Sequence, residues 1–242
     1  MRTPRVYVDL PLAPGRELDL PAEAAVHVAR VLRLRAGEPV VLFNGDGRDF
    51  AARLLVVQRQ GVRVAVEGAG EAEADPPLHL HLAVGVSRGE RMDVVVQKAV
   101  ELGVASIRPL FTERSVVRLD PARLGRRHDH WHGVLVAACE QSGRRRLPRL
   151  HEANALADWL PTVAGTALLL DPRAERSLTE LPAPRVEATL LVGPEGGLSA
   201  EERARAVRAG FMAVRLGPRI LRTETAPLAA LAAMQVLWGD LR

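Results

Sequence analysis

Residues 186–225 read VEATLLVGPEGGLSAEERARAVRAGFMAVRLGPRILRTET, and two strands, each followed by a glycine-bearing loop, can be recognised in them. The apolar run Thr189–Val192 is typical of a buried strand, and the glycines and proline of Gly193–Gly197 favour a tight turn after it. Phe211–Leu216 predicts a second strand, and residues 217–225 predict a second irregular loop.

A helix is expected between these two strands. Ser199 precedes the acidic pair of a helix start, with Glu202 three residues on, and the helix should run to about Ala209 and stop at Gly210. Pro227 suits the first turn of a closing helix at 226–238. In an open α/β sheet the loops after successive strands are where ligands bind. The alternative is that both loops are ordinary connections.

The composition is that of an ordinary globular protein: 242 residues, 48% hydrophobic and 26% charged. No apolar run is long enough to cross a membrane, and the start MRTPRVYVDL lacks the apolar core of a signal peptide, so a cytoplasmic protein is expected. The single cysteine, Cys139, excludes a disulfide framework. The net charge is +4, and almost all of the positive charge comes from arginine. Arginine suits bidentate contacts with phosphate, so the composition modestly favours a polyanionic partner.

The chain is expected to form two domains. In residues 1–70, short strands at 5–8, 40–43, 50–57 and 62–66 surround one helix at 21–34, with a hairpin signal at Asp46–Gly47. The acidic, proline-ended segment 71–77 predicts a linker. From Leu78 to residue 242, strands and helices alternate, which predicts a parallel sheet covered on both faces.

The motifs LLVGPEGGLSAEE and, about twenty residues later, LGPRILRTETA resemble the paired signature of the SPOUT methyltransferases. Within that superfamily they are most similar to the RsmE type, which methylates uridine N3 in 16S rRNA. Residues 97–104 and 138–144 add two upstream matches, so the resemblance covers nearly the whole chain.

The resemblance implies a specific architecture. The first domain would be a PUA-like RNA-binding barrel, and the second a SPOUT-type α/β domain whose C-terminal segment forms a deep trefoil knot. The knotted loops of such enzymes hold S-adenosylmethionine, and the enzymes are homodimers, so a second subunit would partly cover the apolar helix at 226–238. The implied substrate is a uridine of 16S rRNA in the assembled 30S subunit.

Loop backbone can recognise an adenine edge, and glycine lets main chain approach a ligand closely. Four apolar side chains near the loops could pack against the faces of the adenine: Leu170, Leu216, Ile220 and Leu221. The alternative is that these side chains belong to the hydrophobic core, which is the more common role for such a set. With the resemblance, the expected cofactor-binding residues are Leu170, Gly193, Pro194, Glu195, Gly196, Gly197, Leu216, Gly217, Ile220, Leu221 and Thr225.

Uracil N3 is a weakly acidic imide that becomes a good nucleophile only after its proton leaves. We expect Arg222 to stabilise the uracil anion, and Glu224 or Glu195, or a water that one of them holds, to accept the proton. Arg222 and Glu224 are therefore the predicted catalytic residues. The alternative is that the carboxylates accept backbone N–H groups at loop or helix ends.

Arginines are expected to hold the RNA backbone, with a solvated basic face as the alternative for each of them. The candidates are Arg5, Arg30, Arg33, Arg88, Arg114 and Arg144. No metal site is expected, because only two of the alternating histidines 128, 130 and 132 would share a helix face. Two rival functions stay open: a SPOUT enzyme that modifies a ribose 2′-OH or guanine N1, and a non-enzymatic RNA-binding assembly factor.

Overall fold

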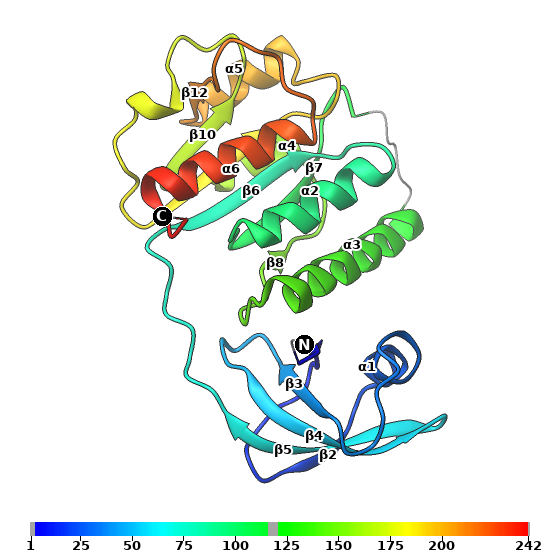
Figure 1. Ribbon diagram of the computed structural model, residues 1–242. Coiled ribbons are helices and arrows are strands. Elements are labelled where there is room, and N and C mark those ends of the chain that lie inside the picture. The colour runs from blue at the N-terminus through cyan, green and yellow to red at the C-terminus, as the bar shows by residue number, and fades with distance from the viewer. Residues whose placement is uncertain (1–2, 116–120, 242) are drawn as a thin grey trace. The chain divides into compact units, whose positions relative to one another are not determined.

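The computed structural model describes residues 3–115 and 121–241 (Figure 1). The chain divides into two compact units: Met1–Asp75 with Val136–Leu147, and Pro76–Leu135 with Pro148–Arg242. The alternation of strands and helices predicts one domain over 78–242, whereas the end of helix α3 (Pro121–Ser142) clusters with the first unit. A long-range contact ties this end of α3 to the first sheet: the Tyr7 N–H donates to Glu140 Oε1 at 3.0 Å.

The first unit is built on a five-stranded sheet in the order β1-β3-β4-β5-β2. Strand β1 runs parallel to β3, and the other neighbours are antiparallel. Alternating side chains such as Leu42, Leu54 and Val64 fill its core. The strands are β1 (Arg5–Tyr7), β2 (Glu17–Asp19), β3 (Pro39–Phe43), β4 (Phe50–Gln58) and β5 (Gly61–Ala69).

The helix expected at 21–34 is shorter than its apolar pattern suggests. It comprises α1 (Ala22–Val26) and a wider π-type turn, His27–Val31, in which the Leu32 N–H donates to His27 O at 2.9 Å. Arg33 then adopts φ 55°, which ends the helix. The hairpin at Asp46–Gly47 is confirmed, because β3 and β4 pair antiparallel around it.

The second unit is a seven-stranded parallel sheet, which confirms the predicted α/β fold. Its order is β12-β10-β11-β6-β7-β8, and β9 also pairs with β7. Strands β8 and β9 escape sequence analysis because each has only two residues. The strands are β6 (His79–Gly85), β7 (Ser106–Phe111), β8 (Arg149–Leu150), β9 (Asn154–Ala155), β10 (Thr166–Leu170), β11 (Glu187–Val192) and β12 (Met212–Val214).

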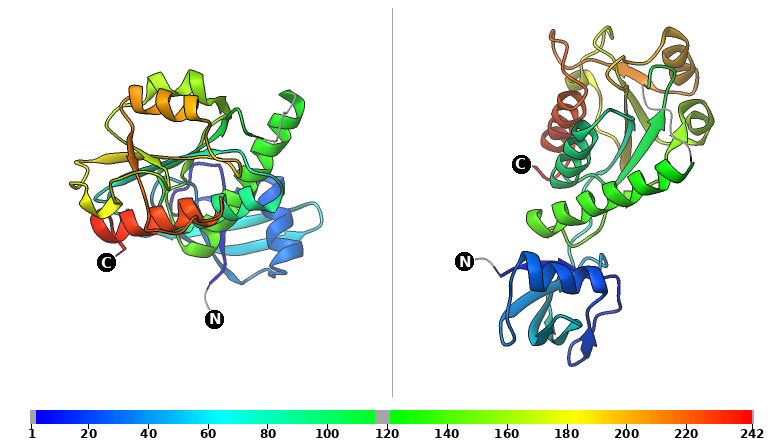
Figure 2. Two further views of the ribbon diagram at one scale, coloured as in Figure 1. Left: turned by 90° about the horizontal axis from the view of Figure 1, so that it is seen from above. Right: turned by 90° about the vertical axis from the view of Figure 1, so that its right-hand side faces the viewer.

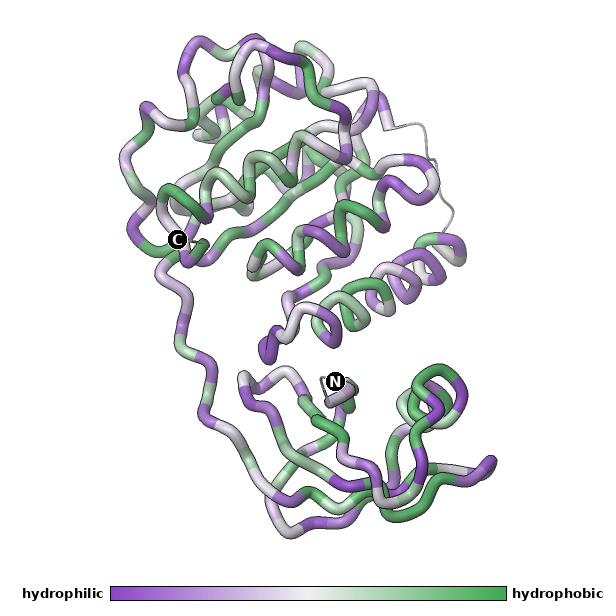
Figure 3. The backbone as a smooth tube through the Cα atoms, viewed as in Figure 1, coloured by the Kyte–Doolittle hydropathy of each residue, from purple (hydrophilic) through white to green (hydrophobic). Residues whose placement is uncertain are grey.

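Helices cover both faces of this sheet (Figure 2). On one face, α4 (Leu156–Trp159) and α5 (Ala200–Arg208) pack over a core that includes Leu169 and Leu191. On the other face, α2 (Glu90–Glu101) packs against α6 (Thr225–Trp238). Helix α6 is apolar along most of its length (Figure 3). The described residues also contain three short 3₁₀ or π segments: η1 (His27–Val31), η2 (Leu160–Thr162) and η3 (Leu178–Glu180).

The position of β10 matters most for the site. It lies between β11 and β12, in register with both, so the carboxyl ends of three strands gather at one edge. The loops after β11 and β12, which the sequence predicts, therefore lie beside a third loop, which follows β10. The trefoil knot stays a prediction. Among the described residues, no helix is long and apolar enough to cross a membrane.

Candidate functional site

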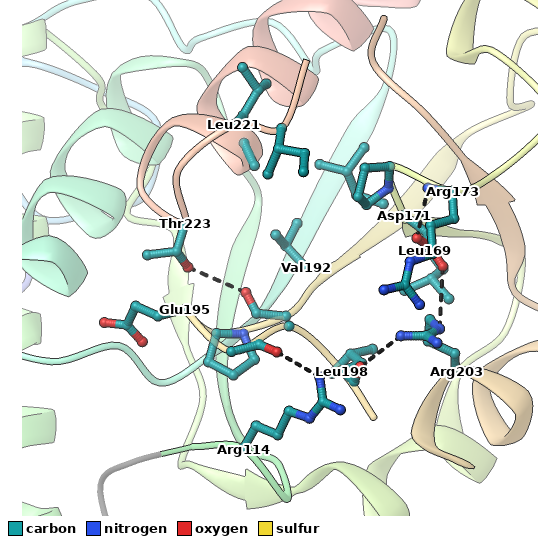
Figure 4. A pocket seen from close by; sticks show the side chains of 18 of the residues that line it. Arg114, Leu169, Asp171, Arg173, Val192, Glu195, Leu198, Arg203, Leu221 and Thr223 are labelled. Carbon is teal, nitrogen blue, oxygen red and sulfur yellow. Dashed lines mark hydrogen bonds and ion pairs between the residues drawn. The ribbon is translucent and has the colours of Figure 1, made fainter. Parts of the chain in front are cut away.

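A cavity of about 270 Å³ opens where the loops after β10, β11 and β12 meet (Figure 4). Its floor is apolar, with Leu169, Val192 and Leu221 among the lining side chains, and much of its rim is main chain of the loop Gly193–Gly197. The cavity thus forms at the edge of the sheet where the sequence predicts a ligand-binding site.

The loop Gly193–Gly197 is packed so tightly that it leaves no room for a Cβ atom at Gly193, nor at Gly85 beside it. A Cβ on Gly193 would lie 2.9 Å from the Leu198 nitrogen, and a Cβ on Gly85 would lie 2.5 Å from the Pro194 ring. Gly197 has φ 64° and donates its N–H to Pro194 O at 2.7 Å. The loop is therefore a tight turn pressed against the end of β6.

Helix α5 fixes the far side of this loop. The predicted capping box is confirmed: the Glu202 N–H donates to Ser199 Oγ at 3.1 Å, and the Ser199 N–H to Glu202 Oε2 at 2.8 Å. The other oxygen of the buried Glu202 accepts the Glu113 N–H at 2.7 Å. This carboxylate thereby joins the helix start to the loop after β7.

Thr223 connects the loop after β12 to the loop Gly193–Gly197 by a hydrogen bond. Its hydroxyl donates to Gly193 O at 3.3 Å (Figure 4). The same hydroxyl lies 3.3 Å from that of Ser87, a buried residue just after β6. The sequence alone does not predict this role for Thr223, because Gly193 and Ser87 are both distant from it in the chain.

The third loop contributes a charged pair to the cavity. Asp171 follows β10, its side chain is 15% exposed, and its Oδ2 lies 3.5 Å from Arg203 Nε. Arg203 also donates to Leu198 O at 2.9 Å. Neither residue was predicted. Arg203 looks like a solvated helix residue in the sequence, and only the order of the strands brings it to the cavity.

A second cavity, of about 430 Å³, adjoins the first and shares with it Glu195, Ile220, Leu221 and Thr223. Glu195 Oε1 accepts the Arg88 N–H at 3.0 Å and an Arg91 N–H at 3.1 Å. Partial burial raises the pKa of Glu195, but these hydrogen bonds outweigh burial, and the net pKa lies below its usual value. Glu195 is thus an anion whose Oε1 is already engaged.

Glu224, on the wall of the second cavity, has a different environment. Its Oε2 is buried without a hydrogen-bond partner among the described residues, and Arg91 Nε lies 3.9 Å away, too far for a hydrogen bond. The exposed Arg222 lines the same cavity. The structure therefore brings together a carboxylate that already accepts two N–H groups, a carboxylate that is ion-paired with Arg91 but accepts no hydrogen bond at Oε2, and an accessible guanidinium.

Most predicted cofactor-binding residues line the first cavity. These are Leu170, Gly193, Pro194, Glu195, Gly196, Gly197, Leu216, Ile220 and Leu221. Gly217 and Thr225 do not line it. Gly217 instead turns the second loop with φ 63°, and Thr225 begins α6. The two predicted catalytic residues, Arg222 and Glu224, face the second cavity.

The structure contradicts the phosphate-binding role expected for Arg5. Its side chain is 5% exposed, and its guanidinium donates to Asp49 Oδ1 at 2.6 Å and to Cys139 O at 2.9 Å. It also lies 4.5 Å from the ring centroid of Phe43. Arg5 holds the end of α3 against the first sheet. Cys139 is also buried, and burial raises the pKa of its thiol to about 11, so it is an inert core residue.

The other candidate arginines differ in position. Arg30, Arg33 and Arg88 are exposed, and Arg144 is half-buried. Arg114 lines the first cavity and donates to Gly196 O at 3.0 Å, which braces the glycine loop. Phosphate contacts by these five residues remain predictions.

The first cavity fits an adenosyl compound. Apolar side chains suit the faces of an adenine, exposed main chain suits its edge, and the half-buried carboxylate of Asp171 suits ribose hydroxyls or an ammonium group. Gly193 leaves no room for a side chain, so main chain itself forms the wall there.

Comparisons with known proteins agree with this site. The RNA methyltransferase domain family matches residues 74–235, and the RNA methyltransferase PUA domain family matches residues 20–67. A Legionella pneumophila methyltransferase, solved with bound S-adenosylmethionine, is 40% identical with a TM-score of 0.96, and each chain is covered completely.

Two further relatives carry a more specific name. A ribosomal RNA small subunit methyltransferase E from Neisseria gonorrhoeae, bound to S-adenosylmethionine, is 38% identical with a TM-score of 0.93 and complete coverage of both chains. The Buchnera aphidicola protein of the same name is 31% identical, over 99% of this chain and 98% of its own length.

The fold, the paired cavities and the matching families define an RNA methyltransferase with a PUA domain. More narrowly, the chain belongs to the ribosomal RNA small subunit methyltransferase E family.

Proposed function

We propose that this protein methylates N3 of a uridine in 16S rRNA within the 30S subunit. The cofactor is S-adenosylmethionine, which supplies an electrophilic methyl group on a sulfonium and is held by the first cavity. The target base enters the second cavity. The resemblance would place that uridine at position 1498 of 16S rRNA.

The buried oxygen of Glu224 carries this proposal, because it accepts no hydrogen bond from the described residues and has only the ion pair with Arg91 at 3.9 Å. A buried acceptor without a donor is costly, and the imide N–H of uracil is a donor that fits it. Because Glu195 Oε1 already accepts two N–H groups, Glu224 is the better proton acceptor of the two. The positive charge of Arg222 then stabilises the uracil anion.

The remaining parts of the proposal concern binding. The PUA unit holds rRNA through its arginines, without reading sequence. A second copy of the chain covers the outer face of α6, where Val236 and Leu237 are 54% and 39% exposed, together with Val94 of α2.

Nucleoside mass spectrometry of small-subunit rRNA, with and without the protein, tests the reaction. We expect 3-methyluridine to appear only with the protein. A 2′-O-methylated nucleoside or 1-methylguanosine would assign another target. Failure to bind S-adenosylmethionine in calorimetry would favour an assembly factor without catalysis.

Two variants test the assigned roles. Glu224→Gln and Arg222→Ala are expected to lower kcat by about 10²- to 10⁴-fold with unchanged cofactor affinity, because each removes a group that acts on the base. Normal binding of cofactor and RNA together with the parent rate would show that the assigned role is wrong.

A further inference from the structure

Ile220 is an unusual residue for a folded surface. Its side chain is 87% exposed, more than any other large hydrophobic side chain in the described part of the chain, where Val31 follows at 65%. It stands between two exposed arginines, Arg219 and Arg222. A lone apolar side chain among cations is well placed to meet a partner that is both polyanionic and apolar, such as a nucleic acid with stacked bases.

Both ends of the loop that carries Ile220 are fixed. On one side, Gly217 turns the chain with φ 63°. On the other, Thr223 donates to Gly193 O, and Arg222 O accepts the N–H groups of Thr225 at 2.9 Å and of residue 226 at 2.8 Å. Ile220 is also β-branched and therefore stiff about χ1. It is presented on an anchored loop.

Ile220 lines both cavities. A nucleotide whose base occupies the second cavity therefore has its neighbours in the strand within reach of this side chain. Enzymes that act on a base must take it out of its stack, and apolar side chains can fill the space that it leaves. Every aromatic residue in 3–115 and 121–241 is buried or half-buried, so no fully exposed aromatic ring is available there to fill the space that the base leaves in its stack.

We propose that Ile220 is a wedge that enters the RNA base stack when the target nucleotide turns out into the second cavity, while Arg219 contacts the adjoining phosphates. The inference rests on the proposed function only in requiring that a base of the RNA enters this cavity. Ile220 is a positioning residue, because it acts on the neighbours of the target and not on the reacting atoms.

The competing role is the one expected from sequence, in which Ile220 packs on the adenine of the cofactor. The two roles differ in what Ile220→Ala changes. A wedge affects RNA methylation and leaves cofactor affinity alone, whereas an adenine contact affects cofactor affinity even when RNA is absent.

The experiment first locates the methylated nucleotide by mass spectrometry, whatever its identity. Small subunits are then reconstituted on 16S rRNA that has either the native bases or abasic sites beside that nucleotide. The full-length protein, Ile220→Ala and Ile220→Met are compared by kcat/KM, and S-adenosylmethionine affinity is measured by calorimetry. Val207→Ala is the matched control, because Val207 is 53% exposed on α5 and lines neither cavity.

On native subunits, Ile220→Ala is expected to lower kcat/KM roughly tenfold, while Ile220→Met and Val207→Ala stay within about twofold. With abasic neighbours there is no stack to replace, so the loss from Ile220→Ala should shrink to about twofold. Ile220 lines the first cavity but is 87% exposed, so it has little apolar contact to lose there, and cofactor affinity should change by less than about twofold. An equal loss on both substrates, or a weaker cofactor affinity that accounts for the loss, would overturn the wedge. Either result leaves the chemical identity of the product, and so the proposed function, untouched.

Discussion

Replacing Thr223 by valine should loosen the cofactor cavity without changing its volume. The variant keeps the shape of the side chain but loses the hydroxyl that donates to Gly193 O and meets Ser87 Oγ, both at 3.3 Å. A neutral hydrogen bond contributes about 0.5–1.5 kcal/mol. Because both bonds are long, we expect the pair to contribute roughly 1–2 kcal/mol.

This loss should appear in two measurements. Both bonds exist in the folded chain before any ligand binds, so the free energy of unfolding in urea should fall by about 1–2 kcal/mol. The same loop forms a wall of the first cavity, and the cofactor must order this loop again in the fraction of molecules where the variant releases it. The Kd for S-adenosylmethionine in calorimetry should therefore rise, by at most about 30-fold.

Two control variants distinguish the loss of the Thr223 hydrogen bonds from a non-specific loss of stability. Thr223→Ser keeps the hydroxyl and should bind cofactor nearly as the parent does. Thr179→Val removes a hydroxyl that is bonded to Ser177 at 3.0 Å on an exposed segment, and should change stability by less than about 0.5 kcal/mol. Parental affinity and parental urea midpoint in Thr223→Val would refute the reasoning that this hydroxyl holds the two loops together.

Three further outcomes are expected. Arg5→Met should lower the free energy of unfolding by about 2–4 kcal/mol, because it removes the buried donor to Cys139 O and leaves Asp49 paired with Arg145 alone at 3.3 Å, while cofactor affinity stays within about twofold. Burial first, and then the charge of Arg108, lower the pKa of His151 from 6.5 to about 4. Since the unfolded chain binds this proton more readily, stability should fall as pH drops from about 6.5 towards 4, and His151→Gln should flatten that fall in urea titrations. Gly193→Ala should weaken cofactor binding in calorimetry at least tenfold, because its Cβ has no space, whereas Gly61→Ala, with nothing within 4 Å, should not.

The sequence predicts the parts of this protein that local chemistry determines. Ser199 and Glu202 identify the start of α5 because a capping box needs only neighbours in the chain. Arg203 was missed because its role depends on β10 lying between β11 and β12. Arg5 was misjudged for a related reason. Burial of a guanidinium depends on Asp49 and on α3, which no local pattern connects to residue 5.

The sharing of one loop by two cavities suggests where the catalytic power of the site comes from. Residues 220, 221 and 223 line both cavities, so the same backbone sets the separation of methyl donor and acceptor. Alignment of this kind can supply much of a rate enhancement with few catalytic groups. The two contributions are separable: Glu224→Gln should lower kcat while both substrates still bind, whereas Thr223→Val should disturb the geometry of both cavities at once. If Thr223→Val lowers kcat by more than its effect on cofactor affinity explains, alignment by this loop contributes to the chemical step as well as to binding.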